Sequence, residues 1–288
     1  MHPERVPMSS LRLTLTTSAV MVAFAANSLL CREALASGSL GASSFTLVRL
    51  ACGAVCLWIL ARLRSRDGSV GGDWLSAAAL FGYAAAFSFA YISLSAGTGA
   101  LLLFAAVQIT MIAYGLWCGE RLTPLQIVGA VAAVGGLVWL VLPGVEAPEP
   151  LGALLMLTAG ASWGVYSLRG RDAQDPTATT AGNFIRALPF AVALFLLTGG
   201  RQEVWTPAGL IYAAASGALA SGLGYALWYT VLPNLKATTA ATLQLSVPIL
   251  AALGGVLLLS EALTLRFGTA SLAVLGGILM FILHRPAR

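Results

Sequence analysis

Apolar stretches and short polar segments alternate along the whole chain. Each of ten apolar stretches is close to the roughly 20 residues that a helix needs to cross a bilayer. They cover residues 14–31, 43–61, 75–95, 98–118, 124–142, 151–168, 179–198, 207–231, 238–259 and 265–283. An isolated strand would leave its backbone unsatisfied in lipid, so each stretch must be helical. The pattern predicts an all-α membrane protein with ten transmembrane helices.

Charge is scarce and unevenly placed. Only 9% of the residues are charged, against about 25% in soluble domains, so most of the surface must face lipid. With the N-terminus in the cytoplasm, eleven of the 16 lysines and arginines lie in inner segments and three in outer ones, and Arg49 and Arg186 fall within spans. Inner loops are normally enriched in basic residues. We therefore expect a multi-pass protein with both termini in the cytoplasm.

The second half of the chain repeats the first after a shift of about 141 residues, read from the positions of matching motifs. Glu-x-Leu-Thr at Glu120–Thr123 recurs at Glu261–Thr264, and a later Gly-Gly pair recurs at the same spacing. The alternative is a chance overlay of apolar sequences. A true duplication predicts two five-helix units, residues 1–147 and 148–288. Five is odd, so the second unit would be inverted, as in many secondary transporters.

The repeated motifs carry a resemblance to the drug/metabolite transporter superfamily and its ten-span EamA-type branch. The residues concerned are the two Glu-x-Leu-Thr turns, the Gly-Gly pairs, Arg49, Arg186 and Trp163. Within that branch, chain length, Asn27 and the aromatic central spans resemble YddG-type aromatic amino acid exporters. One departure is the sequence Phe24–Asn27, where many relatives have a Trp-Gly pair. The resemblance implies export of small organic solutes across a bacterial inner (plasma) membrane.

Aromatic and amide side chains near mid-membrane are the candidate cargo contacts. Rings spaced four residues apart share one helix face in span three, and a second aromatic group lies in span eight, its repeat mate. Such stripes also arise from plain helix packing, and amides often bond only to other helices. The predicted substrate-binding residues are Asn27, Tyr83, Phe87, Tyr91, Trp163, Asn183, Tyr225, Trp228, Tyr229 and Gln244. Pro248, inside span nine, is the predicted hinge, because proline bends a helix.

Four charged residues and a set of small residues have competing interpretations. Arg49 and Arg186 could reach the headgroups, bond loop carbonyls or bind a cargo carboxylate. Glu120 and Glu261 are expected to be structural caps at helix N-termini. Small residues four apart in spans five and ten predict close helix packing, between these two spans or at an oligomer contact.

No motif in the chain indicates an enzyme, a cofactor or a nucleic-acid partner. The four cysteines lack metal-ligand and disulfide-framework spacing, and no P-loop or His-Glu-x-x-His is present. Every acidic residue lies in a loop or near a helix end. We expect a secondary transporter, monomeric or weakly homo-oligomeric in lipid, that exports aromatic and other amino acids by alternating access without a membrane-embedded proton-carrying carboxylate. Exporters of nucleosides or cationic drugs, an intramembrane enzyme and a structural membrane subunit are the alternatives.

Overall fold

The computed structural model describes residues 9–64, 70–171, 173–199, 203–235 and 237–283, and helices make up most of them. The first half contains α1 (Ser10–Ala36), α2 (Ala42–Arg64), α3 (Trp74–Ala90), α4 (Ala96–Trp117) and α5 (Pro124–Val141). The second half contains α6 (Pro150–Gly170), α7 (Pro176–Leu197), α8 (Pro207–Ala215), η2 (Ser216–Leu223), α9 (Gly224–Val231), η3 (Leu232–Asn234), α10 (Ala237–Gln244), α11 (Ser246–Leu259) and α12 (Leu265–Leu283).

The ten predicted spans correspond to this order once the interrupted helices are joined. In the described chain, nine stretches are long and apolar enough to cross a membrane, and α3, with 17 residues, is a shorter tenth. Large apolar side chains such as Leu63, Val131, Leu257 and Leu272 are exposed on the outside of the bundle. The prediction of an all-helical membrane protein is confirmed.

Helix starts follow from residues immediately before them. Asp73 caps α3 by accepting from the backbone N–H groups of Leu75 and Ser76, and Glu149 caps α6 in the same way. Thr123 and Gln126 form a reciprocal capping box at α5. Helices α5 to α8 each begin with proline, which is favoured there because the first helical N–H needs no partner.

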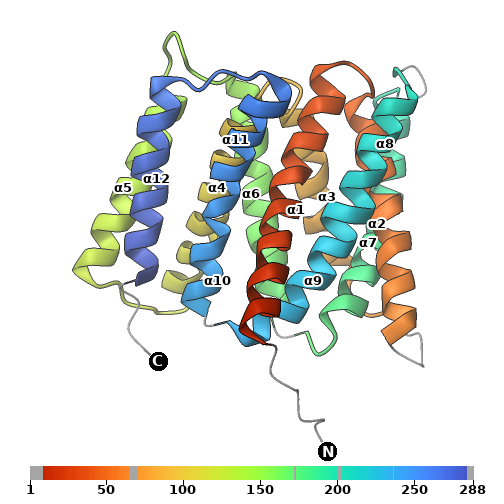
Figure 1. Ribbon diagram of the computed structural model, residues 1–288, viewed down its shortest axis with the longest axis horizontal. Helices are drawn as coiled ribbons and strands as arrows, with labels where there is room; N and C mark the ends of the chain where they lie inside the picture. Colours follow the sequence, from red (N-terminus) through yellow and green to blue (C-terminus); the bar gives the residue numbers. More distant parts are fainter. Residues whose placement is uncertain (1–8, 65–69, 172, 200–202, 236, 284–288) are drawn as a thin grey trace, which may run out of the picture.

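Contacts between helices follow the inverted repeat. Exchanging each helix for its mate in the other half maps the α3–α6 contact onto the contact of α1 with α8, η2 and α9, and α4–α6 onto α1–α11. The α2–α7, α4–α11 and α5–α12 contacts each pair a helix with its own mate. In Figure 1 the first turn of α1 and the last turn of α12 lie at the same end of the bundle. This arrangement matches an inverted repeat of five and five spans.

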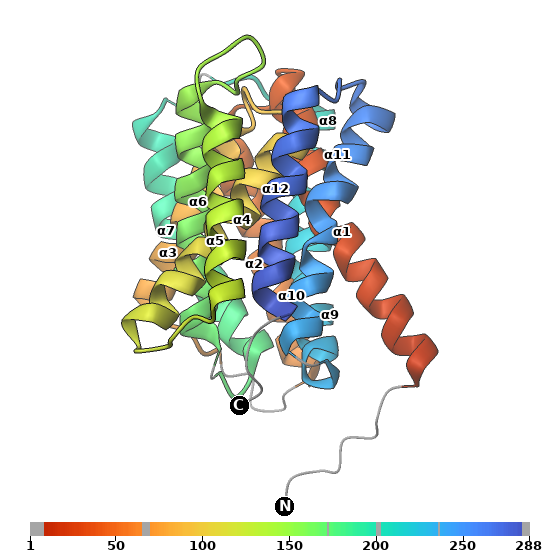
Figure 2. The ribbon, with the colours of Figure 1, turned by 90° about the vertical axis from the view of Figure 1, so that its left-hand side faces the viewer.

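Helices α5 and α12 form a tight pair at one side of the molecule (Figures 1 and 2). A Cβ atom added at Gly129 would lie 2.5 Å from the Gly277 carbonyl oxygen, and one added at Gly277 would clash with the Gly129 carbonyl. By contrast, a Cβ at Gly135 or Gly276 would meet no atom within 4 Å. The predicted contact between spans five and ten is therefore confirmed, and glycine permits the close backbone approach.

Two spans of the second half are interrupted near their middles, whereas their mates α3 and α4 are continuous. The α8–α9 span contains the π-helix η2, and the α10–α11 span breaks at Leu245. Pro248 lies in the first turn of α11 and has no N–H to give the Gln244 carbonyl, which accounts for the break. A bend at this place was predicted from Pro248, and its role as a hinge stays a prediction.

Candidate functional site

The Trp163 indole lies among three tyrosine rings that come from different helices. Its ring centroid is 4.9 Å from that of Tyr83 on α3, 5.2 Å from Tyr225 on α9 and 5.3 Å from Tyr166 on its own helix, α6. Tyr83 belongs to the first half of the repeat, whereas Trp163 and Tyr225 belong to the second. We call Tyr83, Trp163, Tyr166 and Tyr225 the aromatic cage.

The aromatic stripe of α3 extends from this cage toward the end of the bundle away from the termini. Tyr83 contacts Phe87 at 5.4 Å, and Phe87 contacts Tyr91 at 4.7 Å between ring centroids. On the other side, Phe24 of α1 lies 5.8 Å from Tyr225 and 6.1 Å from Trp228. Both predicted stripes thus contact Trp163 directly, one through Tyr83 and the other through Tyr225.

Polar groups gather beside the cage around the hydroxyl of Tyr83. Asn27 Nδ2 donates to this hydroxyl at 3.2 Å and Arg49 Nη2 at 2.8 Å. Arg49 Nε donates to Ser221 Oγ at 3.4 Å, and Ser216 Oγ donates to Asn27 Oδ1 at 2.7 Å. All five residues are buried. We call Asn27, Arg49, Tyr83, Ser216 and Ser221 the polar cluster.

The π-helix η2 brings its two serines into this cluster. Its backbone lies directly against α2, because a Cβ atom at Gly217 would clash with the carbonyl oxygen of Arg49. A Cβ at Gly222 would lie 2.9 Å from Cys56 Sγ. Glycine at these positions lets η2 approach α2 closely enough for Ser221 to reach Arg49. Short π segments are uncommon in helices and are often found at functional sites.

Six of the predicted binding residues lie outside the cage and the polar cluster, and two of them, Phe87 and Trp228, make the ring contacts described above. Tyr91 is fully buried, and its hydroxyl donates to the Ala96 carbonyl at 3.3 Å. Asn183 accepts from the Asp73 N–H at 3.0 Å and donates to Tyr166 at 3.4 Å. Tyr229 accepts from Thr180 at 3.5 Å, and Gln244 ends α10 at the break. Their roles in binding stay predictions.

A model of the EamA-like transporter family matches residues 13–142 and again 150–283. The chain belongs to the EamA-like transporter family. The two matches fall in the two predicted units, and membership makes the chain a multi-pass membrane transporter. The precise boundary at residue 147 stays a prediction.

Proteins similar to this chain include transporters and one protein without an assigned role. "Uncharacterized protein PA1977" of Pseudomonas aeruginosa is 55% identical over 89% of each chain. The threonine/homoserine exporter RhtA of Escherichia coli is 34% identical over 53% of this chain and 52% of its own length. A "probable amino-acid metabolite efflux pump" of the same species is 28% identical over 64% and 69% of the two chains. A crystal structure with 20% identity aligns with a TM-score of 0.68 over 97% of this chain and all of its own, which supports the fold alone.

At the end of this EamA-family bundle away from the termini, α1 is tied to both halves. Arg32 forms an ion pair with Glu261 at 2.9 Å and donates to the carbonyls of Tyr91 and Ile92. Glu261 also accepts from the Ala96 N–H at 2.8 Å. Its predicted role as a cap is confirmed, but the helix that it caps is α4 rather than the following α12, which Thr264 caps.

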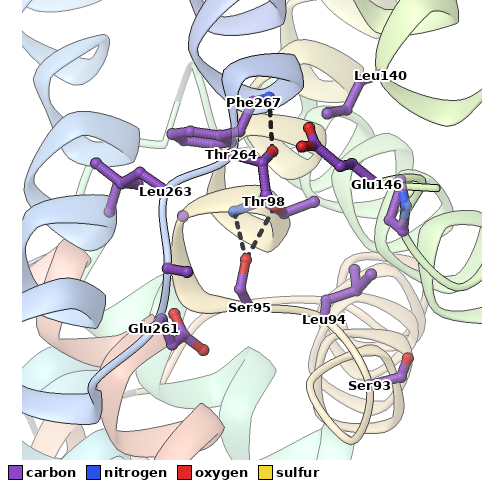
Figure 3. A pocket seen from close by; sticks show the side chains of 14 residues that line it. Ser93, Leu94, Ser95, Thr98, Leu140, Glu146, Glu261, Leu263, Thr264 and Phe267 are labelled. Atoms are coloured by element: carbon purple, nitrogen blue, oxygen red, sulfur yellow. Dashed lines mark hydrogen bonds between the residues drawn. The ribbon is translucent and has the colours of Figure 1, made fainter.

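A cavity of about 210 Å³ lies beside this ion pair, between the α3–α4, α5–α6 and α11–α12 connections. Figure 3 shows Glu146 and Glu261 on different sides of it and Thr98 bonded to Ser95 between them. Glu146 already accepts from the Arg266 N–H, and Glu261 from Arg32 and Ala96. The cavity therefore lies at helix ends rather than at mid-span, apart from the aromatic cage.

The opposite end of the transporter carries a second polar network. Arg169 of α6 donates to Asp73 at 3.0 Å and to Ser76 at 3.0 Å. Arg186 donates to the carbonyls of Gly71 and Gly182. Partial burial alone would raise the pKa of Asp73, but hydrogen bonds from Ser76 and Arg169 outweigh it and lower this pKa to about 2. At each end of the bundle, an ion pair therefore joins the first half of the chain to the second.

Several members of the site were not among the predicted residues. Phe24 and Tyr166 are each close in sequence to a predicted residue, and helical spacing from Asn27 or Trp163 could have indicated them. Ser216 and Ser221 had no such signal, because serine occurs throughout apolar helices and the π-helix that positions them has no sequence mark. The aromatic core of the site was thus largely predicted, whereas the two serines of its polar side were not.

Proposed function

We propose that this chain exports amino acids, aromatic ones foremost, across the bacterial inner membrane by alternating access. The observation that carries the proposal is the contact of Trp163 with Tyr83 and Tyr225, because it joins the two halves through aromatic rings near mid-span. Rings that line such a site hold an apolar or aromatic side chain well. The polar cluster beside the cage suits the charged end of an amino acid.

The names of two relatives support amino acid export, and one of them favours a second cargo. The relative named as a threonine/homoserine exporter points to small hydroxylated amino acids. The hydroxyls of Ser216 and Ser221, together with the amide of Asn27, give this cargo hydrogen-bond partners. The aromatic cage favours phenylalanine, tyrosine or tryptophan instead. Nucleosides, cationic drugs and a structural role have no comparable support.

The test is solute flux through the purified chain in liposomes. Vesicles loaded with unlabelled phenylalanine should accumulate labelled phenylalanine and tryptophan by exchange, and protein-free vesicles should not. Labelled threonine and homoserine form the second arm. Movement of these two without phenylalanine or tryptophan would replace the aromatic cargo by the hydroxylated one. Absence of flux for all four would contradict the proposal.

The cage is tested by Trp163→Ala, with Trp117→Ala as the matched control. Trp163 contacts three tyrosines, whereas Trp117 ends α4 with 89% of its surface exposed. An aromatic contact contributes about 0.5–1.5 kcal/mol, so phenylalanine flux should fall by about two- to tenfold in the first variant only. Wild-type flux in folded Trp163→Ala protein would remove the cage from the proposal.

A further inference from the structure

Arg49 is the largest fully buried side chain among the described residues, with 1% of its surface exposed. Its guanidinium lies 5.0 Å from the ring centroid of Tyr83 and 4.9 Å from that of Phe87. Nη2 and Nε donate to Tyr83 and Ser221, but Nη1 has no hydrogen-bond partner. A donor that is buried without a partner costs free energy, and a charged one costs more.

The described part of the chain also gives Arg49 no counter-ion. The ion pairs found there join Arg32 to Glu261 and Arg169 to Asp73. Tyrosine and serine hydroxyls and two ring faces surround the guanidinium, and all of these are neutral. Charged side chains within membrane spans are expensive and usually functional. A purely structural brace between α2, α3 and η2 would explain Nη2 and Nε, but it leaves Nη1 and the net charge unexplained.

Other arginines of the bundle show how the fold satisfies such a group when its role is structural. Arg186, the repeat mate of Arg49, donates from Nη1 to the carbonyls of Gly71 and Gly182 near a helix end. Arg266 donates to the carbonyls of Trp139 and Leu142. Arg49 has no such carbonyl among its recorded partners. The two halves therefore differ, because Nη1 is without a partner in Arg49 and bonded to backbone carbonyls in Arg186.

We propose that Arg49 Nη1 binds the carboxylate of the cargo, so that this transporter selects solutes that carry a carboxylate. The inference rests on the proposed function and adds the group that the site recognises. Tyr83 links the two parts of the site, because its ring contacts Trp163 while its hydroxyl accepts from Arg49. A cargo ring at Trp163 and a carboxylate at Arg49 thus lie on the two sides of one residue, as the two ends of an aromatic amino acid require.

Arginine suits this task because it stays charged and offers several N–H donors to a carboxylate. Hydrogen bonds between ionised groups are about twice as strong as neutral ones. The bond at Nη1 would also neutralise the buried charge while cargo is present. An amide or amine analogue of the same shape offers neither benefit, so discrimination between matched analogues measures this bond directly.

The experiment compares phenylalanine with phenylalaninamide as competitors of labelled cargo in liposomes. Wild-type protein should prefer the carboxylate by about tenfold or more, which corresponds to about 1.4 kcal/mol. Arg49→Gln should bring this ratio close to one, and Arg49→Lys, which keeps the charge, should retain part of it. Arg186→Gln, the control in the other half, should keep the wild-type ratio. Equal competition by acid and amide in wild-type protein overturns the inference, and this reading needs no folded variant.

A separate arm distinguishes failure of the inference from failure of the proposed function. If no aromatic amino acid moves, the proposed cargo is wrong, and thermal stabilisation of the purified chain then tests Arg49 with threonine, homoserine and phenylacetate beside their amides. Stabilisation by the acids that is lost in Arg49→Gln supports the inference. Equal stabilisation by the acids and their amides, or no stabilisation by either, overturns the inference.

Discussion

The hydroxyl of Tyr83 is the point at which the aromatic and polar parts of the site meet. It accepts hydrogen bonds from Asn27 on α1 and Arg49 on α2, while the ring beneath it contacts Trp163. One oxygen atom therefore satisfies two buried donors from two other helices. Loss of this oxygen alone, with the ring kept, should therefore affect the stability of the protein.

Tyr83→Phe should lower stability although it keeps the ring. Removing the oxygen leaves buried donors of Asn27 and Arg49 without a partner, at about 1–3 kcal/mol for each unsatisfied group. The thermal unfolding midpoint of the purified chain in detergent should fall clearly. Tyr212→Phe, a half-buried change in α8 outside the cluster, is the control and should leave the midpoint near wild type. An unchanged midpoint in Tyr83→Phe would show that water replaces the hydroxyl.

Asp73 gives the chain an acid-dependent contribution to stability. Its pKa is lowered to about 2 in the folded state, against about 3.9 in an unfolded chain. A carboxylate whose pKa is lower in the folded state stabilises the fold at pH values above its pKa in the unfolded chain. This contribution is lost as the pH falls from about 4 to 2. Unfolding midpoints of wild type and Asp73→Asn should therefore converge over this interval. A constant difference down to pH 2 would contradict the assignment.

Residue chemistry was only partly visible in the sequence. Trp163, Tyr83 and Tyr225 were predicted because aromatic residues at helical spacing are conspicuous in apolar spans. Tyr91 was predicted on the same ground and Asn183 as a mid-membrane amide, but both form hydrogen bonds near helix ends. Spacing along one helix shows which side chains share a face. It does not show which neighbour that face meets, and this decides between a cargo contact and a packing contact.

At the scale of helices, close approach of α5 and α12 depends on one glycine of each Gly-Gly pair. Gly277→Ala should destabilise the pair, because its Cβ would meet the Gly129 backbone, which cannot turn aside as a side chain can. Gly276→Ala is the matched control, since its Cβ faces open space and alanine favours a helix by about 1 kcal/mol. The unfolding midpoint should fall in the first variant and hold or rise in the second. The reverse order would refute the packing.

Helix positions were predictable, but helix irregularities were not. All ten spans follow from apolar runs and their capping residues, since length and hydropathy determine what crosses a bilayer. The break at Leu245 follows from Pro248 and was predicted within a few residues. The π-helix η2 was missed, because its small residues are equally compatible with an α-helix. The π-helix lies where η2 packs closely against α2, and the residue types of η2 alone do not indicate it.

For the whole molecule, the inverted repeat predicts where the termini lie. The first turn of α1 and the last turn of α12 lie at one end of the bundle, and the distribution of basic residues predicts that this end faces the cytoplasm. Tags at the two termini should both be cleaved by protease in inverted membrane vesicles and both be protected in intact spheroplasts. Protection of only one tag in either preparation would contradict the ten-span topology.

The positions of the carboxylates predict how transport is driven. In the described chain, acidic side chains lie in loops or near helix ends, and none lies in the polar cluster. Proton-coupled carriers usually have an ionisable acid inside the membrane. Exchange of labelled cargo in liposomes should therefore be unchanged when a pH gradient is imposed or collapsed with an ionophore. Uphill accumulation driven by that gradient would show that another group carries the proton.

The inverted repeat relates the helix contacts of the two halves, but the halves are not identical. If the two halves were identical, the inward-open and outward-open forms would have equal free energies, because each would contain the same helix interfaces with the two halves exchanged. Within the described residues, the π-helix and the break at Leu245 occur in the second half alone. Arg49 has a buried donor without a partner, whereas Arg186 Nη1 donates to the carbonyls of Gly71 and Gly182. Under the proposed alternating access, the two open forms are therefore expected to differ in free energy before any cargo binds.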